Sequence, residues 1–436
     1  MSDFKRVLIL GTGPTSIQLA VFLKKHLNCY VGIAGRDSVR SETLFKTLRQ
    51  SDHLIRVSVQ NEKHRTMEGE CFVNEVFRGY ETIKGEWDTI IFSVTADAYI
   101  EVLKQLSEQI LKQVKCIVLI SPTFGSNSLI SYYLNKFNLE AEIISFSTYL
   151  GDTRWMLDGP SNHVLTTAVK KKIFIGSTHF PSENVDKLCK VYEQLGIELK
   201  IMGTPFEAET RNISLYVHPP LFMNDFSLGA MFGDIETKKY VYKMYPEGPI
   251  TQYLVRDMLS QWKEIMTILE KVNVKKINLL QFMTDDNYPV RLESLSRQDI
   301  ESFYHLDPIH QEYLLYIRYT SLLIDPYSEP DEEGRYFDFS AVPIRRVFVN
   351  REGYLDIPRM PKEDYYRTKI IQGIAKYLDL KCPTIDKFIE KYESKLEEVA
   401  QSRKGEMLSH AFTVQSFDED VNMICDEIRK IIATKM

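Results

Sequence analysis

The sequence predicts an α/β fold, in which a doubly wound parallel sheet is followed by a mainly α-helical domain. Over the first 150 residues, apolar β-prone runs alternate with helical patterns. After about residue 206 the pattern is mostly helical, as in "PITQYLVRDMLSQWKEIMTILEKV" and "HQEYLLYIRYTSLLI". Near-continuous apolar strands that alternate with helices are typical of a parallel sheet covered on both faces. We therefore expect a first domain at residues 1–205 and a helical second domain at residues 206–436.

Each strand of the first domain is predicted from a short apolar run that ends at a turn or a helix. The strongest are Val7–Leu10, Tyr30–Ala34, "WDTIIFSVT" with its end at Ser93–Thr95, "CIVLISP" and Ile143–Phe146. Leu54–Val59 and Cys71–Val73 are shorter candidates, and Val164–Val169 and Lys172–Ile175 are expected to extend the same sheet as antiparallel strands. Helices are expected at Ile17–Leu27, in "SETLFKTLRQ", and at about residues 98–113 and 128–137.

Composition narrows the class of protein. The 436 residues carry a formal net charge of -6, which argues against a general nucleic-acid binder. The sequence contains no run of about 18 apolar residues, so we expect no membrane-spanning helix. The six cysteines are scattered without a CxxC pair, and no compact His/Cys spacing indicates a metal site. We expect a cytoplasmic protein with reduced thiols, no bound metal, and neither a membrane nor a nucleic acid as partner.

The stretch "RVLILGTGPTSIQLAVFLKKH", residues 6–26, combines a strand, a glycine turn and a helix. In a Rossmann-type fold the first glycine makes the tight turn, and the second lets the backbone approach a pyrophosphate at the helix N-terminus. Gly11 and Gly13 match these roles, and Ser16 replaces the third glycine. The hydroxyl of Ser16 or of Thr15 can also reach a phosphate oxygen. The cofactor-binding turn is thus predicted to comprise Gly11, Thr12, Gly13, Pro14, Thr15 and Ser16; the alternative is a tight turn without a ligand.

The end of the second strand indicates which cofactor is bound. A carboxylate there would bond the ribose 2′-hydroxyl of NAD, whereas an arginine would accommodate a 2′-phosphate. The strand ends in "GIAGRDSVR", so Arg36 comes first, followed by Asp37, Ser38 and Arg40. A guanidinium can clamp a phosphate through two parallel N–H bonds. The pattern favours NADP(H); the alternative is that the arginines are solvated and Asp37 holds the ribose.

Further candidates follow other predicted strands. Ser93 and Thr95 in "FSVTADAY", and Ser121 and Pro122 in "LISPTFGSN", stand where strands end at the ligand crevice of such folds. They are predicted to line the nicotinamide ribose and the pyrophosphate, or else to be ordinary loop caps. Asp152, in "STYLGDTRW", is a candidate for binding the substrate amine or the nicotinamide ribose.

His218 is the candidate proton donor. It lies in "RNISLYVHPPLFMND" before two prolines, which predicts a position near a helix break or loop after the nucleotide domain. A histidine there can exchange a proton with a substrate as hydride arrives. The alternative is a structural histidine at a helix end.

The N-x5-H-P pattern of Asn212 and His218-Pro219 resembles the opine dehydrogenases. In that family the histidine acts on the keto/imine centre, and a late arginine–tyrosine motif runs into an aspartate and a proline that supply its carboxylate partner. Arg318-Tyr319 and Asp325-Pro326 resemble this motif, although Ile324 replaces the usual acid before the aspartate. The resemblance therefore implies Asp325 as the partner of His218, with Asp307 in "HLDP" as a rival.

Four stretches resemble, more specifically, the staphylopine-type opine metallophore dehydrogenases: "LGTGPTSIQLA", "STYLGDTRW", "VHPPLFMNDFSL" and "YLLYIRYTSLLIDP". The resemblance implies a cofactor-dependent enzyme that uses NADPH to condense a 2-keto acid such as pyruvate with the primary amine of a nicotianamine-like conjugate. It implies small-molecule substrates, a helical catalytic and dimerisation domain, and a homodimer. The alternatives are another two-domain NADPH-dependent keto-acid reductase and a non-catalytic NADP-sensing protein.

Overall fold

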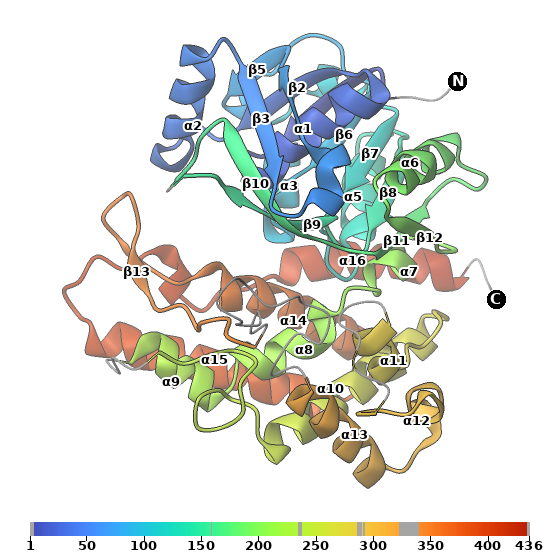
Figure 1. Ribbon diagram of the computed structural model, residues 1–436, viewed down its shortest axis with the longest axis vertical. Coiled ribbons are helices and arrows are strands. Elements are labelled where there is room, and N and C mark those ends of the chain that lie inside the picture. The colour runs from blue at the N-terminus through green and yellow to red at the C-terminus, as the bar shows by residue number, and fades with distance from the viewer. Residues whose placement is uncertain are drawn as a thin grey trace. The chain divides into compact units, whose positions relative to one another are not determined.

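The computed structural model describes residues 4–157, 159–233, 238–285, 290, 293–321 and 340–433. The backbone forms two compact units (Figure 1). The first comprises residues 1–212 and 426–436, and the second residues 213–425. Among the described residues, no helix has both the length and the apolar character that a bilayer crossing requires.

An eight-stranded sheet forms the centre of the first unit, in the order β12-β11-β8-β7-β6-β1-β2-β5. Its strands are β1 (Arg6–Leu10), β2 (Tyr30–Gly35), β5 (Glu75–Arg78), β6 (Thr89–Phe92), β7 (Cys116–Leu119), β8 (Glu142–Phe146), β11 (Lys172–Ser177) and β12 (Glu198–Ile201). The six strands β5, β2, β1, β6, β7 and β8 are neighbours in the sheet and all pair in parallel. When these six are numbered by their order in the chain, their order across the sheet is 3-2-1-4-5-6, which is that of a doubly wound fold. The predicted Rossmann-type sheet is confirmed.

The edge of this sheet follows the prediction only in part. β11 pairs antiparallel with β8, as expected of the strand that begins at Lys172. The run predicted as a strand at Val164–Val169 does not extend this sheet. It belongs to a second, four-stranded sheet in the order β4-β3-β10-β9. The strands of this sheet are β3 (Leu54–Val59), β4 (Gly69–Phe72), β9 (Gly151–Trp155) and β10 (His163–Val169). In β10 buried Val164 and Thr166 alternate with half-buried neighbours, as in a strand with one covered face, whereas the middle of β11 is continuously buried.

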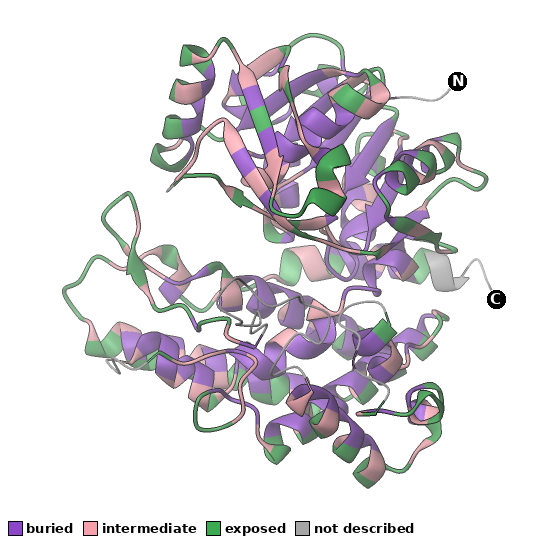
Figure 2. Ribbon diagram, in the orientation of Figure 1, coloured by how far each residue is buried: buried purple, intermediate pink, exposed green. Residues whose placement is uncertain are grey.

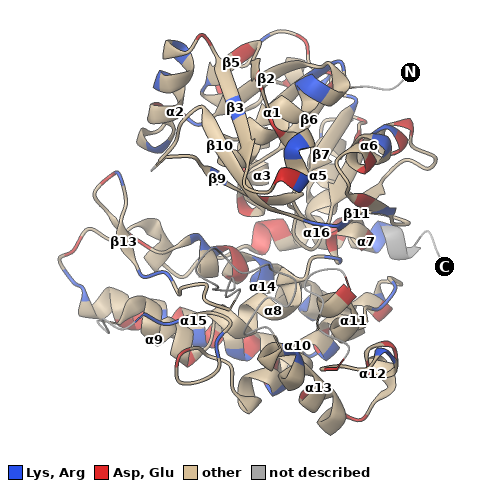
Figure 3. Cartoon of the chain, viewed as in Figure 1, with Lys and Arg blue, Asp and Glu red and all other residues tan. Residues whose placement is uncertain are grey.

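Helix α1 (Pro14–Leu27) lies between the two sheets and contacts strands of both. Its residues Ser16–Leu23 are all buried, which is expected of a helix covered on every side. The Oε1 of the polar member Gln18 accepts hydrogen bonds from the hydroxyls of Tyr149 (2.5 Å) and Thr153 (2.6 Å), whereas its Nε2 is buried without a partner in the described chain. Figure 2 shows the continuous burial of the central strands, and Figure 3 shows that β6 and β7 carry no charged residue.

The other helices of the first unit cover its sheets. They are α2 (Val39–Gln50), α3 (Tyr99–Gln105), α4 (Glu108–Leu111), α5 (Ser126–Asn135), α6 (Glu183–Gln194) and α7 (Pro205–Glu209). The single helix expected at residues 98–113 is divided into α3 and α4. Ser107 separates them in an extended conformation, and its side chain accepts a hydrogen bond from Ile110 N to cap α4.

The described residues of the second unit are mainly helical, as predicted, and include the two-stranded hairpin β13 (Phe348–Val349) and β14 (Leu355–Asp356). Its helices are α8 (Ser214–Phe222), α9 (Asp225–Phe232), α10 (Gln252–Lys271), α11 (Leu279–Asp285), α12 (Arg297–Ser302), α13 (Pro308–Thr320), α14 (Arg359–Tyr377) and α15 (Pro383–Ser402). Helix α16 (Asp418–Ala433) begins in this unit, and its residues from Asp426 on belong to the first unit.

Helix α8 continues through two prolines, so the expected break near His218 does not occur. A proline inside a helix removes the N–H that would bond the carbonyl four residues earlier. For Pro219 this carbonyl belongs to Leu215, and it accepts a hydrogen bond of 2.7 Å from Gln261 Nε2 of α10. Because the carbonyl freed by Pro219 is satisfied by a buried side chain, no unpaired acceptor is left at that point, and His218 lies within α8.

Candidate active site

The glycine turn leaves an open position at the N-terminus of α1. Gly13 precedes the helix in an allowed extended conformation (φ -82°, ψ 171°), and no side chain caps the first turn. A Cβ placed on Gly13 would meet no atom within 4 Å. A free helix N-terminus with room beside the backbone suits a phosphate group. The turn therefore fits the pyrophosphate of a dinucleotide.

Gly11 and Ser16 serve the packing of this turn against β6. Gly11 has a φ of +140°, and a Cβ on it would lie 2.5 Å from the backbone oxygen of Ser93. Ser16 is buried, and its hydroxyl donates to Ser93 Oγ over 2.9 Å. Ser16 thus closes the helix onto the strand end, the role that a third glycine has in the common fingerprint. Thr12 packs its methyl group over Gly35, and Pro14 and Thr15 remain half-buried at the helix start.

The residues after β2 separate the two alternatives for the cofactor. The Asp37 carboxylate accepts a hydrogen bond of 2.6 Å from Arg78 Nε at the end of β5. Arg36 and Arg40 are exposed, and neither guanidinium has an ion-pair partner in the part of the chain that the structure describes. Ser38 caps α2 by accepting from Ser41 N. Asp37 is thus paired within the fold, whereas Arg36 and Arg40 are exposed at the end of the second strand.

The predicted strand-end residues stand at the carboxyl edge of the parallel sheet. Ser93 and Thr95 follow β6, and Ser93 N donates to Leu10 O at the end of β1 (2.8 Å). The topology switches direction between β1 and β6, which is where ligands bind in doubly wound sheets. Ser121 and Pro122 follow the adjacent strand β7. The structure therefore places all four residues at the edge that carries the glycine turn.

Sequence reasoning missed Glu209, which occupies the N-terminus of α5. Its fully buried carboxylate accepts from Gly125 N (3.0 Å), Asn127 N (2.7 Å) and Asn127 Nδ2 (2.9 Å), and from Ser145 Oγ (2.8 Å). Burial raises the pKa of Glu209 to about 8, against the opposing effect of these donors. An internal carboxylate thus satisfies the first turn of α5, whereas the first turn of α1 stays open for an external anion.

His218 meets a buried carboxylate in the second unit. Its Nδ1 lies 3.3 Å from Oδ1 of Asp364, a residue of α14. The Asp364 side chain is fully buried, whereas that of His218 keeps 15% of its surface exposed. The ring also packs edge-on against Phe222, with 5.3 Å between centroids. A carboxylate behind Nδ1 fixes the orientation of the ring and leaves Nε2 available for proton exchange with a substrate.

The surroundings of Asp364 are charged although they are buried. Arg367 Nη1 lies 3.3 Å from the same Oδ1, and Arg367 Nη2 binds Glu363. Arg359 Nε lies 3.2 Å from the other oxygen of Glu363. Asp364 Oδ2 is buried without a hydrogen-bond partner in the described chain. No family motif in the sequence pointed to this helix; the available signal was the pair Glu363-Asp364 followed one turn later by Arg367.

The other carboxylates proposed from the sequence lie elsewhere. Asp307 caps α13 by accepting from His310 N (3.0 Å). Asp325 lies outside the described residues. Asp152 is exposed on β9 in the four-stranded sheet, where its carboxylate accepts from Thr167 Oγ1 (2.9 Å). In the motif thought to lead to Asp325, Arg318 and Tyr319 are both buried in α13, and the Tyr319 hydroxyl contacts Met258 Sδ.

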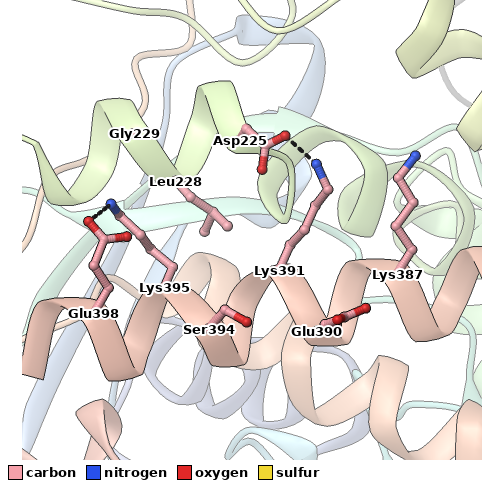
Figure 4. Close-up of a pocket in the computed structure, with 9 residues that line it drawn as sticks. All are labelled: Asp225, Leu228, Gly229, Lys387, Glu390, Lys391, Ser394, Lys395 and Glu398. Atoms are coloured by element: carbon pink, nitrogen blue, oxygen red, sulfur yellow. Dashed lines mark hydrogen bonds and ion pairs between the residues drawn. The ribbon is translucent and has the colours of Figure 1, made fainter.

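A groove of about 460 Å³ lies between α9 and α15 (Figure 4). Three lysines of α15 line it, and each is paired with a carboxylate: Lys387 with Asp257, Lys391 with Asp225 and Lys395 with Glu398. Because its cations are neutralised, the groove offers little attraction to an anionic ligand. Among the described residues, no cluster of three or more His, Cys, Asp or Glu side chains could hold a metal ion.

Residues 5–428 match the family model described as staphylopine dehydrogenase. The chain is 47% identical over 421 residues to the staphylopine synthase of Staphylococcus aureus (strain Mu50), with 96% of this chain and 97% of that protein covered. It is 33% identical over 388 residues to the pseudopaline synthase of Pseudomonas aeruginosa (strain UCBPP-PA14), with 89% of each covered. The solved structure of NADP+-bound yersinopine dehydrogenase superposes with a TM-score of 0.91 at 28% identity, covering 99% of this chain and 100% of that one.

Proposed function

The chain belongs to the staphylopine dehydrogenase family, and we propose on this premise that it is an NADPH-dependent opine dehydrogenase that makes a staphylopine-type metallophore. In the proposed reaction, a 2-keto acid such as pyruvate condenses with the primary amine of a nicotianamine-like conjugate, and the product is reduced. The keto acid, the amine, NADPH and a proton give the opine, NADP+ and water. The observation that carries the proposal is the His218–Asp364 pair in a chain with an open dinucleotide turn.

The residues of the first unit fit NADP(H). Gly13 would face the pyrophosphate, Arg36 and Arg40 the 2′-phosphate, and Ser93, Thr95, Ser121 and Pro122 the ribose and nicotinamide side of the crevice. Bound NADPH supplies the hydride that reduces the imine. The open position at Gly13 and the paired state of Asp37 support this assignment, as does the NADP+-bound yersinopine dehydrogenase structure.

His218 is proposed to handle the protons of the condensation. Attack of the amine on the keto group gives a carbinolamine, whose hydroxyl must take up a proton to leave as water. An imidazole with an available Nε2 can deliver this proton and take one up again. Asp364 would hold the ring in the tautomer and orientation that this exchange needs. We assign these steps to residues 206–436 as the catalytic domain.

Asp152 and Asp325 enter the proposal differently. Asp152 remains a predicted amine or ribose ligand, because its carboxylate is exposed and accepts a hydrogen bond from Thr167 Oγ1. Asp325 remains the partner implied by family resemblance, beside the described partner Asp364. The homodimer likewise stays a prediction, which light scattering after gel filtration would check.

The test is NADPH oxidation by the purified protein with pyruvate, with a D-histidine–aminobutyrate conjugate, and with both. Oxidation that needs both, with a product mass equal to the two substrates minus one oxygen atom, supports the proposal. Oxidation with the keto acid alone would identify another keto-acid reductase. NADPH binding without oxidation under any of these conditions would identify a non-catalytic NADP-sensing protein.

A further inference from the structure

Three charged side chains in the first two turns of α14 are buried next to one another, and we call them the buried row. Glu363, Asp364 and Arg367 keep 7%, 0% and 5% of their side-chain surface exposed. Arg367 lies one turn after both acids, so its fork reaches Asp364 with one nitrogen and Glu363 with the other. Buried charges of this kind are costly unless they are paired and fixed in geometry. Their retention beside a candidate catalytic histidine calls for a role.

One oxygen atom links this row to His218. Asp364 Oδ1 lies 3.3 Å from both His218 Nδ1 and Arg367 Nη1, whereas Oδ2 has no hydrogen-bond partner in the described chain. A carboxylate held only by His218 could rotate and present either oxygen. Because Arg367 binds the same oxygen and is itself held by Glu363, the carboxylate has one favoured orientation toward the imidazole.

We infer that Arg367 is a positioning residue for the His218–Asp364 pair, with Glu363 as its anchor. A guanidinium is always charged, so Arg367 places a fixed positive charge beside the Asp364 oxygen that faces Nδ1 of His218. Arg367 acts through Asp364, and its own side chain is 5% exposed. The inference rests on the proposed function, because it assigns a task in that reaction.

The chain offers a conservative variant and a matched control. Arg367→Lys keeps the charge but cannot bind Asp364 and Glu363 through two planar nitrogens at once. Arg359→Gln removes another arginine that touches Glu363, but one whose side chain is 72% exposed and lies beside the other oxygen of that carboxylate. Arg367→Met removes both charge and fork, and Arg367→Lys also covers the case in which Arg367→Met does not fold.

Steady-state kinetics and NADPH titration measure the effect on turnover. Partners behind metal-bound histidines typically contribute about 10–100-fold, and we expect Arg367→Lys to lower kcat by about that factor. The KM values and the Kd for NADPH should change by less than about threefold, and Arg359→Gln should match the wild type. Arg367→Lys in an Asp364→Asn background should add little, because both changes break the same link. Independent, multiplicative losses would overturn the inference.

A second readout does not depend on turnover. The hydrogen-bonded Nδ1–H of His218 should give a downfield proton NMR signal in the wild type and in Arg359→Gln. The signal should be lost in Asp364→Asn and shifted or broadened in Arg367→Lys. If the wild type shows no opine synthesis, the proposed function fails while this signal still tests the positioning. An unchanged signal in Arg367→Lys, with wild-type kcat, would show that Arg367 serves only the fold.

Discussion

Oδ1 of Asp364 lies 3.3 Å from Nδ1 of His218, although 146 positions separate the two residues in the chain. The histidine comes from α8 and the aspartate from α14, two helices that pack against each other. The same pairing brings Thr368 Oγ1 of α14 within 3.9 Å of Met223 Sδ, directly after α8. The dyad is therefore built into a helix–helix contact of the second unit.

Loss of either member of the dyad should reduce turnover without releasing the cofactor. General acid–base help is typically worth about 10²–10⁴-fold, so His218→Ala should lower kcat by about that factor and keep the Kd for NADPH within a few fold. His218→Gln should not restore turnover, because an amide cannot exchange the proton. Asp364→Asn should give a smaller loss and add little to His218→Ala. Near wild-type kcat in His218→Ala, with saturating keto acid and amine, would assign His218 a structural role.

Arg36 should determine the preference for NADPH over NADH. A hydrogen bond to a charged group contributes about 1.5–3 kcal/mol, or roughly 10- to 150-fold in affinity. Arg36→Ala should weaken NADPH by about this factor and leave NADH nearly unchanged, as measured by fluorescence titration. Arg49→Ala, at the exposed end of α2, the helix that follows Arg36, is the matched control and should alter neither. Equal losses for both cofactors would exclude a 2′-phosphate contact.

Substitutions at the two glycines of the turn should have different effects: one on NADPH binding and the other on stability. Gly13 has room for a side chain and an ordinary φ, so Gly13→Val should fold but lose NADPH binding, since the side chain occupies the place of the pyrophosphate. Gly11→Ala instead meets a backbone oxygen at a φ of +140°, where strain costs about 1–3 kcal/mol. It should lower the thermal midpoint. Unaltered NADPH titration by folded Gly13→Val would contradict the assignment of the turn.

Glu209 should make stability fall as pH rises through neutrality. Its pKa is raised from 4.5 to about 8 by burial, so between these values the folded chain keeps a proton that the unfolded chain has released. Unfolding then releases a proton, and the free energy of unfolding decreases with pH by at most about 1.4 kcal/mol per unit. Above about pH 8 Glu209 is deprotonated in both the folded and the unfolded chain, so it no longer changes the free energy of unfolding as the pH rises further.

The effect of Glu209 on the pH dependence of stability can be tested by measuring the thermal midpoints of the wild type and of Glu209→Gln from pH 5 to pH 8. The variant does not titrate, so its midpoint should depend less steeply on pH, although loss of an acceptor lowers it overall. The hydroxyl of Ser145 can reverse to accept the carboxyl proton, which allows the protonated form to stay in place. Parallel curves for the two proteins would contradict a raised pKa.

The Rossmann-type fold of the first unit could be predicted from the sequence because its main determinants are local. The apolar run of β1, the glycine turn and the start of α1 fall within about 20 consecutive residues, and Arg36 follows at the end of the next strand. Backbone conformation at a turn and burial of an apolar strand depend mainly on neighbouring residues. The parallel order of the strands then follows from the few topologies that right-handed crossovers permit.

The sequence by itself determined the fold class and the glycine turn after the first strand, and it singled out His218 as the candidate proton donor. Only the tertiary structure decided which carboxylate meets His218, which helix end Glu209 fills, and which sheet β10 joins. It also supplied Gln261 of α10, whose side chain satisfies the Leu215 carbonyl that Pro219 frees inside α8. Long-range partners are chosen by the packing of whole faces, and many acids along the chain are equivalent until the fold buries one of them beside the imidazole.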